Sequence, residues 1–279
     1  MKNGYGAALA PLNFQKDAPG ARLTINRWVE DQTHNKIRDL IPVGSVNADT
    51  RLVLVNALYF KAPWDVSFKP RLTQPEPFYV GGNEVRSVPT MSTERFLGYR
   101  HADGFTTVAL PYTGSDLQFV IFLPYARVGI DAVAARLTSD YLRSSAHLTE
   151  DRSSAEVRLF LPKFHLRGST IGLGDALQSL GMKTAFDRPT GTADFSRIAP
   201  RRPDDYLAIS EVFHQTFLVV DKKGTEAAAS TSVKFVGGLG IMATPPQPIE
   251  VRVDHPFLFA IQHRTSGLCL FLGRVTDPR

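Results

Sequence analysis

The side chains that carry most enzyme chemistry are scattered through this sequence rather than grouped into catalytic motifs. The seven histidines are dispersed, and none has the spacing of a metal-ligand pair. The chain has no Gly-x-Ser-x-Gly nucleophile elbow, no Gly-x-x-x-x-Gly-Lys phosphate loop and no His-Glu-x-x-His zinc motif. Gly237-Gly-Leu-Gly240 is similar to part of a dinucleotide loop, but prolines follow it where a helix is required. The sequence therefore predicts a protein that is not an enzyme and has no metal or cofactor.

The most informative segment runs from Thr225 to Val236 and alternates with the period of a strand. One face carries Thr225, Ala227, Ala229, Thr231, Val233 and Phe235, and the other carries Glu226, Ala228, Ser230, Ser232, Lys234 and Val236. This alternation is typical of a half-buried strand, yet the small side chains offer little apolar area to anchor it. Glycines flank the segment on both sides. Two interpretations stay open here: a mobile loop that can become a strand, or an ordinary edge strand with a glycine-rich turn.

The rest of the chain predicts helices interleaved with mostly antiparallel strands. Helical periodicity covers residues 21–41, 131–143 and 171–181, and strand patterns cover 51–60, 157–166 and 213–220, with hairpins at 106–123 and 257–275. The strand at 51–60 is nearly all apolar, which predicts a central strand buried on both faces. Pro162 predicts an edge or a bulge. Without a βαβ rhythm, the expected class is α+β, with mixed, mostly antiparallel sheets and packed helices.

Composition excludes some partners. The chain has 279 residues, 43% of them hydrophobic, and a net charge of +5. Its basic residues are scattered, so we expect no nucleic-acid partner. No run of eighteen apolar residues exists, so we expect no membrane-spanning helix. One cysteine, Cys269, rules out an internal disulfide and leaves the redox compartment open.

Several motifs resemble those of the serpin family of serine protease inhibitors. Gly224-Thr-Glu-Ala-Ala-Ala-Ser-Thr231 is similar, almost letter for letter, to the hinge of inhibitory serpins. Val251-Arg-Val-Asp-His-Pro-Phe-Leu-Phe-Ala-Ile261 resembles the signature that follows the reactive loop, and Leu272-Gly-Arg-Val275 resembles the closing strand. Residues 25–37 resemble the helix that lies across the main sheet, and residues 55–64 resemble the third strand of that sheet.

The resemblance implies a single serpin domain over residues 1–279, lacking the N-terminal helices of the family, with an exposed reactive-centre loop at about 224–248. It implies a suicide substrate: a protease cuts the loop, and residues 225–236 then insert between the strands at 51–60 and 213–220, as serpin loops do. The implied hinge residues are Gly224, Thr225, Glu226, Ala227, Ala228, Ala229, Ser230 and Thr231.

The resemblance also implies a site at which the central strands part. Asn56 and His214 match family positions at that opening, and we expect them to hydrogen-bond each other. Two independently satisfied polar core groups are the alternative. Trp64 matches the aromatic residue at the top of the opening, although a lone core tryptophan would have the same sequence signature.

Counting from the hinge by the usual loop length places the reactive bond at Gly238–Leu239, with slippage to Leu239–Gly240 or Met242–Ala243. These residues imply a chymotrypsin-, elastase- or subtilisin-like serine protease as partner. The resemblance further implies a monomer in an extracellular or periplasmic location, because bacterial and animal members of the family are mostly exported. The alternatives are a non-inhibitory serpin-like binding or chaperone protein, or an inactive fragment.

One departure from the family pattern concerns the base of the loop. The family usually has an acidic residue two positions before the hinge glycine, where this chain has Lys222. That difference removes one partner of the ion pair that normally tethers the loop base. Asp221, one position earlier, is a candidate substitute.

Overall fold

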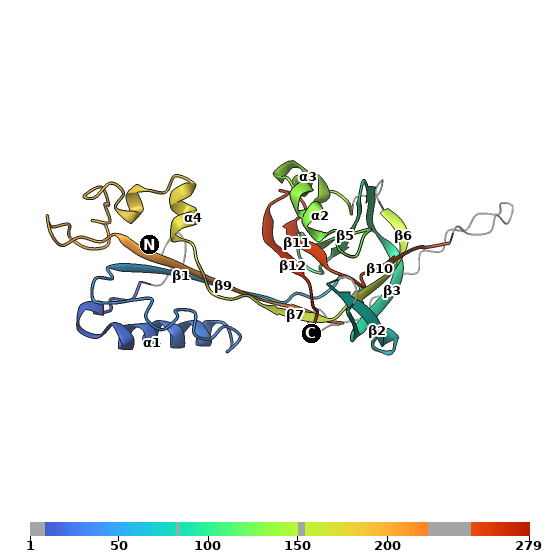
Figure 1. Cartoon of the computed structure of the whole chain (residues 1–279), viewed down its shortest axis with the longest axis horizontal. Helices are drawn as coiled ribbons and strands as arrows, with labels where there is room; N and C mark the ends of the chain where they lie inside the picture. The colour runs from blue at the N-terminus through green and yellow to red at the C-terminus, as the bar shows by residue number, and fades with distance from the viewer. Residues whose placement is uncertain (1–8, 82–83, 150–153, 223–246) are drawn as a thin grey trace. The chain divides into compact units, whose positions relative to one another are not determined.

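The computed structural model describes residues 9–81, 84–149, 154–222 and 247–279 (Figure 1). The chain divides into two compact units, one of Met1–Phe60 with Leu166–Leu218 and the other of Lys61–His165 with Val219–Arg279. The predicted hinge residues 224–231 and the predicted reactive bond Gly238–Leu239 lie outside the described residues. The expectation of one domain over residues 1–279 stays a prediction.

The first unit is a small mixed sheet with a helix along one face. Its elements are α1 (Phe14–Gln32), β1 (Leu52–Phe60), β7 (Phe164–Arg167), β8 (Ile171–Gly172), α4 (Gly174–Ser179), a 3₁₀ turn at Thr184–Phe186, and β9 (Ile209–Val220). The strand order is β1-β9-β7, with β8 paired to β9, and β1 runs parallel to β9. β7 and β9 each carry a few residues into the second unit.

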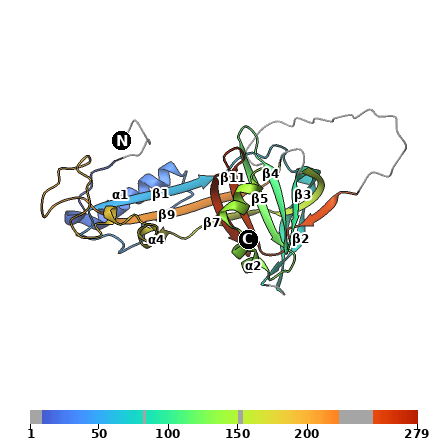
Figure 2. The same ribbon diagram turned by 90° about the horizontal axis from the view of Figure 1, so that it is seen from above.

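Helix α1 is held against this sheet by apolar contacts. Its Val29 is fully buried in a cluster that includes Phe213 of β9 and alternate residues of β1, namely Val53, Val55 and Ala57. Figure 2 shows α1 following the direction of β1 and β9. The helix begins after Asn13, whose side chain accepts a hydrogen bond from the Lys16 amide, and it is kinked at Asp17.

The second unit is built on a larger sheet. Its elements are a 3₁₀ turn at Pro70–Leu72, β2 (Thr73–Val80), β3 (Glu84–Ala102), β4 (Phe105–Pro111), β5 (Leu117–Pro124), α2 (Ile130–Arg136), α3 (Ser139–Ser145), β6 (Ser154–Pro162), β10 (Ile249–Arg252), β11 (Phe257–His263) and β12 (Cys269–Val275). The strand order is β10-β6-β3-β4-β5-β11-β12, with β2 paired to β3. β10 is parallel to β6, and the other pairs are antiparallel.

The core of the second unit lies at the centre of this sheet. β4, β5 and β11 are buried along almost their whole length. Beneath α3, the buried side chains of Gln118 and Gln262 donate hydrogen bonds to backbone carbonyls at the end of that helix. These bonds satisfy carbonyls that a helix end would otherwise leave without partners, so they fix α3 on the sheet.

The predicted α+β class and both predicted hairpins are confirmed. The helix expected at 21–41 starts earlier and ends at Gln32, because His34 and Asn35 adopt left-handed backbone angles that stop it. The helix expected at 131–143 is two helices, since Thr138 is extended and caps α3 through a bond from the Tyr141 amide. The helix expected at 171–181 is β8 followed by the shorter α4.

Two strand predictions also need correction. The strand at 51–60 exists as β1 but is not buried on both faces: Leu54 is 43% exposed and Leu58 is 37% exposed. Within the described residues β1 is the outermost strand of its sheet, and α1 covers one face of it. The strand expected at 157–166 is two strands in different sheets, because β6 ends at Pro162 and β7 begins at Phe164. β2 and β3 were not predicted.

Candidate functional site

The candidate site begins with the ladder between β1 and β9. The strands pair in parallel from Leu52 opposite Ile209 to Phe60 opposite Leu218. Asn56 and His214 lie directly opposite each other, and the Nδ1 of His214 is 2.9 Å from the Oδ1 of Asn56. Because an amide oxygen only accepts, Nδ1 is the donor. The structure therefore brings together the two residues that the sequence suggested would bond each other.

The surroundings of this pair differ from the expectation of a buried amide. Asn56 is exposed and His214 is half-buried. In a strand, residues 54, 56 and 58 point to the same face, and that is the face on which Leu54 and Leu58 are exposed. The hydrogen bond thus links β1 to β9 across a face that α1 does not cover.

Trp64 lies in the second unit, four residues after the end of β1. It is 3% exposed, and its ring stacks on Tyr112 with centroids 4.7 Å apart. Phe68 and Phe119 approach it edge-on at 6.0 and 5.9 Å. Its indole Nε1 donates a 2.8 Å hydrogen bond to the backbone carbonyl of Asp221. Trp64 therefore joins the aromatic core to the residue that immediately follows β9.

Two more contacts bind the same short segment. Lys61 Nζ is 3.7 Å from the Asp221 carboxylate, and the Phe68 amide donates to the Lys222 carbonyl at 3.2 Å. We call this set of contacts, in which Lys61, Trp64 and Phe68 hold Asp221 and Lys222, the loop-base clasp. The clasp fixes the backbone of Asp221 and Lys222, shortly before the hinge motif begins at Gly224. The sequence made Asp221 a candidate for the acidic residue that tethers the loop base. In the structure Asp221 pairs with Lys61.

Burial shapes the electrostatics around the clasp. Burial lowers the pKa of Arg95 to about 10, while the nearby Asp65 acts in the opposite direction. The Arg95 guanidinium donates to the Val66 carbonyl at 2.8 Å and lies 5.9 Å from the Phe68 ring. Burial also raises the pKa of the Tyr112 phenol. The ring stack beside the clasp is therefore neutral, with a cation at its edge.

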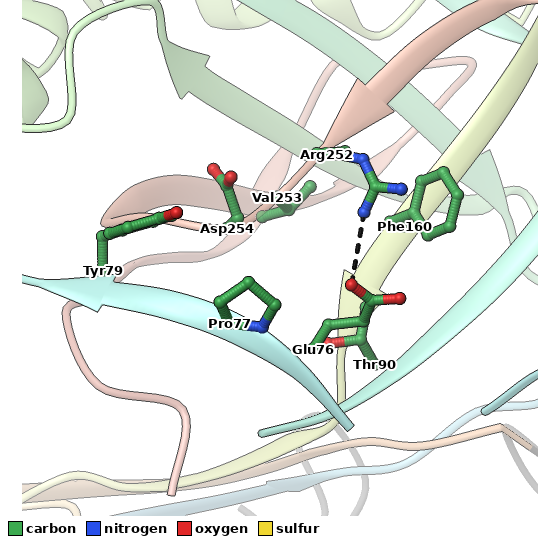
Figure 3. Close-up of a pocket in the computed structure, with 8 residues that line it drawn as sticks. All are labelled: Glu76, Pro77, Tyr79, Thr90, Phe160, Arg252, Val253 and Asp254. Carbon is green, nitrogen blue, oxygen red and sulfur yellow. Dashed lines mark hydrogen bonds and ion pairs between the residues drawn. The ribbon is translucent and has the colours of Figure 1, made fainter. Parts of the chain in front are cut away.

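The segment that matches the family signature begins with β10 and continues into β11. Beyond β10, the Val253 amide donates to Phe160 and the Asp254 carbonyl accepts from the Tyr79 amide at 2.7 Å. His255 is buried, with Nε2 2.8 Å from the Pro124 carbonyl and Nδ1 2.7 Å from the Asp254 carboxylate. A hollow of about 220 Å³ lies between β2 and this segment, and Figure 3 shows the side chains that line it. The chain that follows the predicted loop is thus anchored by backbone bonds at several points.

Two features are absent from the residues that the structure describes. No helix there is long and apolar enough to cross a membrane. Over the same residues, no three His, Cys, Asp or Glu side chains gather into a group that could hold a metal ion.

The family model described as "Serpin (serine protease inhibitor)" matches residues 1–278. The chain belongs to the serpin family. This membership is consistent with the expectation that the chain is not an enzyme, since the description is that of an inhibitor of enzymes.

Relatives extend along nearly the whole of this serpin chain. It is 34% identical to antithrombin-III of Mus musculus over 98% of its length, and 35% identical to a serpin-like protein of Methanosarcina acetivorans over 99%. It spans 57% of the length of the first relative and 62% of the second. It is 36% identical to leukocyte elastase inhibitor A of Rattus norvegicus, of which it spans 71%.

Solved serpin structures share the fold. Uncleaved ovalbumin matches with a TM-score of 0.80 and 27% identity, over 98% of this chain and 67% of that one. Serpin-12 of Manduca sexta matches with a TM-score of 0.79 and 25% identity, over 99% of this chain and 70% of that one. The serpin-like α+β fold predicted from the motifs is therefore confirmed.

Sequence reasoning did not identify Lys61 or Phe68 as members of the clasp. Both follow β1, and Asp221 and Lys222 follow β9. Parallel strands bring their carboxyl ends to the same edge of a sheet, so the residues after β1 and after β9 were candidates for contact once the pairing was assumed. The usable signal was a lysine directly after one strand and an aspartate directly after the other.

We expect reversal of the Lys61 charge to loosen the clasp. Lys61→Glu would place two carboxylates together and lower the unfolding free energy by about 1 kcal/mol, as half-exposed ion pairs do. For a chain of this size, that is a fall in melting temperature of roughly 2–4 °C. Thermal denaturation followed by circular dichroism measures it. The exchanged pair Lys61→Glu with Asp221→Lys should recover most of the loss, and a double variant no more stable than the single one would refute the tether.

Proposed function

We propose that this serpin inhibits a serine protease as a suicide substrate. The observation that carries the proposal is the direct β1–β9 pairing, in which β9 leads through the clasp to the hinge motif Gly224–Thr231. Under this mechanism the protease cuts the loop and remains attached while residues 225–236 enter the sheet between β1 and β9. The family description and the relative named as an elastase inhibitor support this reading.

Insertion would replace the single ladder between β1 and β9 with two ladders, one on each edge of the new strand. An inserted strand pairs on both of its edges, while one existing ladder, including the Asn56–His214 bond, is lost. Each net hydrogen bond contributes about 1 kcal/mol, and ordering one residue costs about 1–2 kcal/mol. The balance is close, so a face of small side chains such as Ala227 and Ala229 favours insertion because it adds no clash and little side-chain entropy.

The clasp has a defined part in this proposal. The clasp joins the residues directly after β1 to those directly after β9. Under this mechanism it has to open before the chain that follows β9 can turn back and enter the sheet between the two strands. The Trp64 bond to the Asp221 carbonyl and the Lys61–Asp221 pair therefore oppose insertion until the loop is cut. The proposal thus uses three separate features: the Asn56–His214 bond in the first unit, the clasp in the second unit, and the hinge motif.

The expected target is a chymotrypsin-, elastase- or subtilisin-like protease that cuts at Gly238–Leu239. Incubation with such proteases should give a covalent complex that survives denaturing electrophoresis, together with a released C-terminal peptide. Mass spectrometry of that peptide identifies the bond, and Leu239–Gly240 or Met242–Ala243 would indicate slippage. Cleavage solely after Lys234 would contradict the assignment, and turnover with no complex would indicate a non-inhibitory serpin. An extracellular or periplasmic location and a monomeric state belong to the same proposal.

A further inference from the structure

β10 is the strand through which the chain re-enters the sheet, and little apolar burial holds it there. It has four residues and, in the described part of the chain, lies outermost in its sheet beside β6. Val251 is 5% exposed, whereas Ile249 is 38% exposed and Glu250 and Arg252 are also exposed. A strand with one buried side chain gains little from the hydrophobic effect.

Arg252 supplies the side-chain contacts that β10 makes with two other strands. It lies opposite Phe160 of β6, and its guanidinium is 3.8 Å from the centre of that ring. Its Nε donates to Glu250 at 2.8 Å, and its Nη1 is 3.5 Å from the Glu76 carboxylate of β2. Figure 3 shows the side chain of Arg252 between Phe160 and Glu76. A planar guanidinium suits this combination of ring stacking and carboxylate pairing.

The surroundings of Arg252 make its contacts sensitive to salt. The side chains of Arg252, Glu250 and Glu76 are 41%, 48% and 33% exposed. On the same face, Arg158 of β6 lies opposite Glu250 and pairs with Glu94 of β3 at 2.7 Å. Charges exposed to this degree are screened strongly at high ionic strength, where the Debye length falls to about 3 Å at 1 M.

The hollow beneath the segment weakens its packing further. A cavity of about 220 Å³ is lined by Glu76, Pro77, Tyr79, Thr90, Phe160 and Arg252, with Val253 and Asp254 beyond. Atoms that line an open hollow of this size face water instead of other side chains, so they add little apolar burial. The contacts of Arg252 therefore carry a larger share of the attachment of β10 than they would in a closely packed strand.

We propose that Arg252 is an ionic latch that holds β10 in the sheet. Loss or screening of its charge makes residues 249–252 open more often, as a unit, while the backbone bonds of Val253 and Asp254 keep the rest of the segment in place. Release leaves the edge of β6 with unpaired backbone groups that can pair with another extended chain. The latch therefore keeps the backbone groups at the edge of β6 paired with β10. It also keeps the chain in register with β6 where it rejoins the sheet.

Hydrogen exchange of the backbone amides of residues 249–252 tests the latch, and it requires no protease. Exchange in Arg252→Met should be roughly tenfold faster than in the unmodified chain, a factor that corresponds to about 1.4 kcal/mol. Glu76→Gln, which removes one partner, should give a smaller acceleration. The matched control is Arg274→Met, since Arg274 forms a 2.5 Å pair with Asp131 away from β10. Exchange at 249–252 should not change in that variant.

A salt titration of the unmodified chain gives a second readout that does not depend on the folding of any variant. Raising the salt to about 1 M should speed exchange at residues 249–252 relative to the buried amides of β11. The proposal is overturned if Arg252→Met exchanges within about twofold of the unmodified chain, or if exchange at 249–252 and at β11 responds equally to salt.

Discussion

If this serpin inhibits as proposed, Ala227→Arg is expected to change it from an inhibitor into a substrate that the protease cuts and releases. Under the proposed function, Ala227 lies on the face of residues 225–236 that enters the sheet between β1 and β9. An arginine there would carry a charge into the sheet, at a cost of several kcal/mol. Insertion competes with hydrolysis of the acyl-enzyme, so slower insertion lets the protease escape. Ala229→Pro should act in the same direction, because proline removes a ladder donor.

The measurement is the yield of covalent complex on a denaturing gel at equal rates of loop cleavage. Both inward substitutions should abolish the complex while the cleaved chain accumulates. Ser232→Arg is the matched control, because residue 232 lies on the opposite face of the same strand pattern and should be nearly silent. Cleavage of the unmodified loop should also raise the melting temperature, since the inserted strand fills the sheet. Equal behaviour of the inward and outward variants would show that the segment is a plain surface strand.

The elements that local pattern determines were predictable from this sequence. The hairpin of β4 and β5 and that of β11 and β12 each combine apolar strands with a short turn, so the pairing partner is the next strand along the chain. β3 was missed although it has 19 residues, because it contains Pro89, Gly98 and several charged residues. Its strand conformation comes from pairing with β2, β6 and β4, none of which its own residues can specify.

The overextended helix shows how packing can imitate periodicity. Ile37, Leu40 and Ile41 continue the helical spacing past the end of α1 and are fully buried in the cluster of α1, β1 and β9. They reach it from an irregular segment, which Asn26 holds by bonding both the amide and the carbonyl of Ile41. The spacing of these apolar residues therefore reflects their burial against α1, β1 and β9, although their backbone is not helical.

The candidate site divides in the same way. The contact between Asn56 and His214 followed from motifs, since both lie within strands whose family positions are recognisable. The Lys61–Asp221 pair did not follow, because it depends on how two strand ends meet and because the family pattern has its acid at the position of Lys222. Contacts made beyond the ends of strands depend on tertiary geometry, so the structure is needed to identify them.

The second large effect is expected at Trp64. Trp64→Ala should lower the unfolding free energy by about 3–5 kcal/mol, as large core truncations do, and the melting temperature by roughly 10 °C or more. The indole is 3% exposed, stacks on Tyr112 and contacts Phe68 and Phe119 edge-on, so its loss leaves a cavity among rings that cannot close together. Trp28→Ala is the matched control, because that tryptophan is 44% exposed on α1 and its loss should cost far less.

Trp64→Phe separates the ring from the hydrogen bond. Phenylalanine keeps most of the aromatic packing but cannot donate to the Asp221 carbonyl, so the expected loss is about 1–2 kcal/mol. That loss should be accompanied by faster hydrogen exchange at Phe68, whose amide bonds Lys222 within the same clasp. Chemical denaturation measures the stability of Trp64→Phe. In a separate variant, Trp28→Phe, Trp64 is the single remaining tryptophan, so its fluorescence reports on the clasp. If Trp64→Phe is as stable as the unmodified chain and exchange at Phe68 is unchanged, Trp64 fills the core without holding the base of the loop, and the clasp has no part in the timing of insertion.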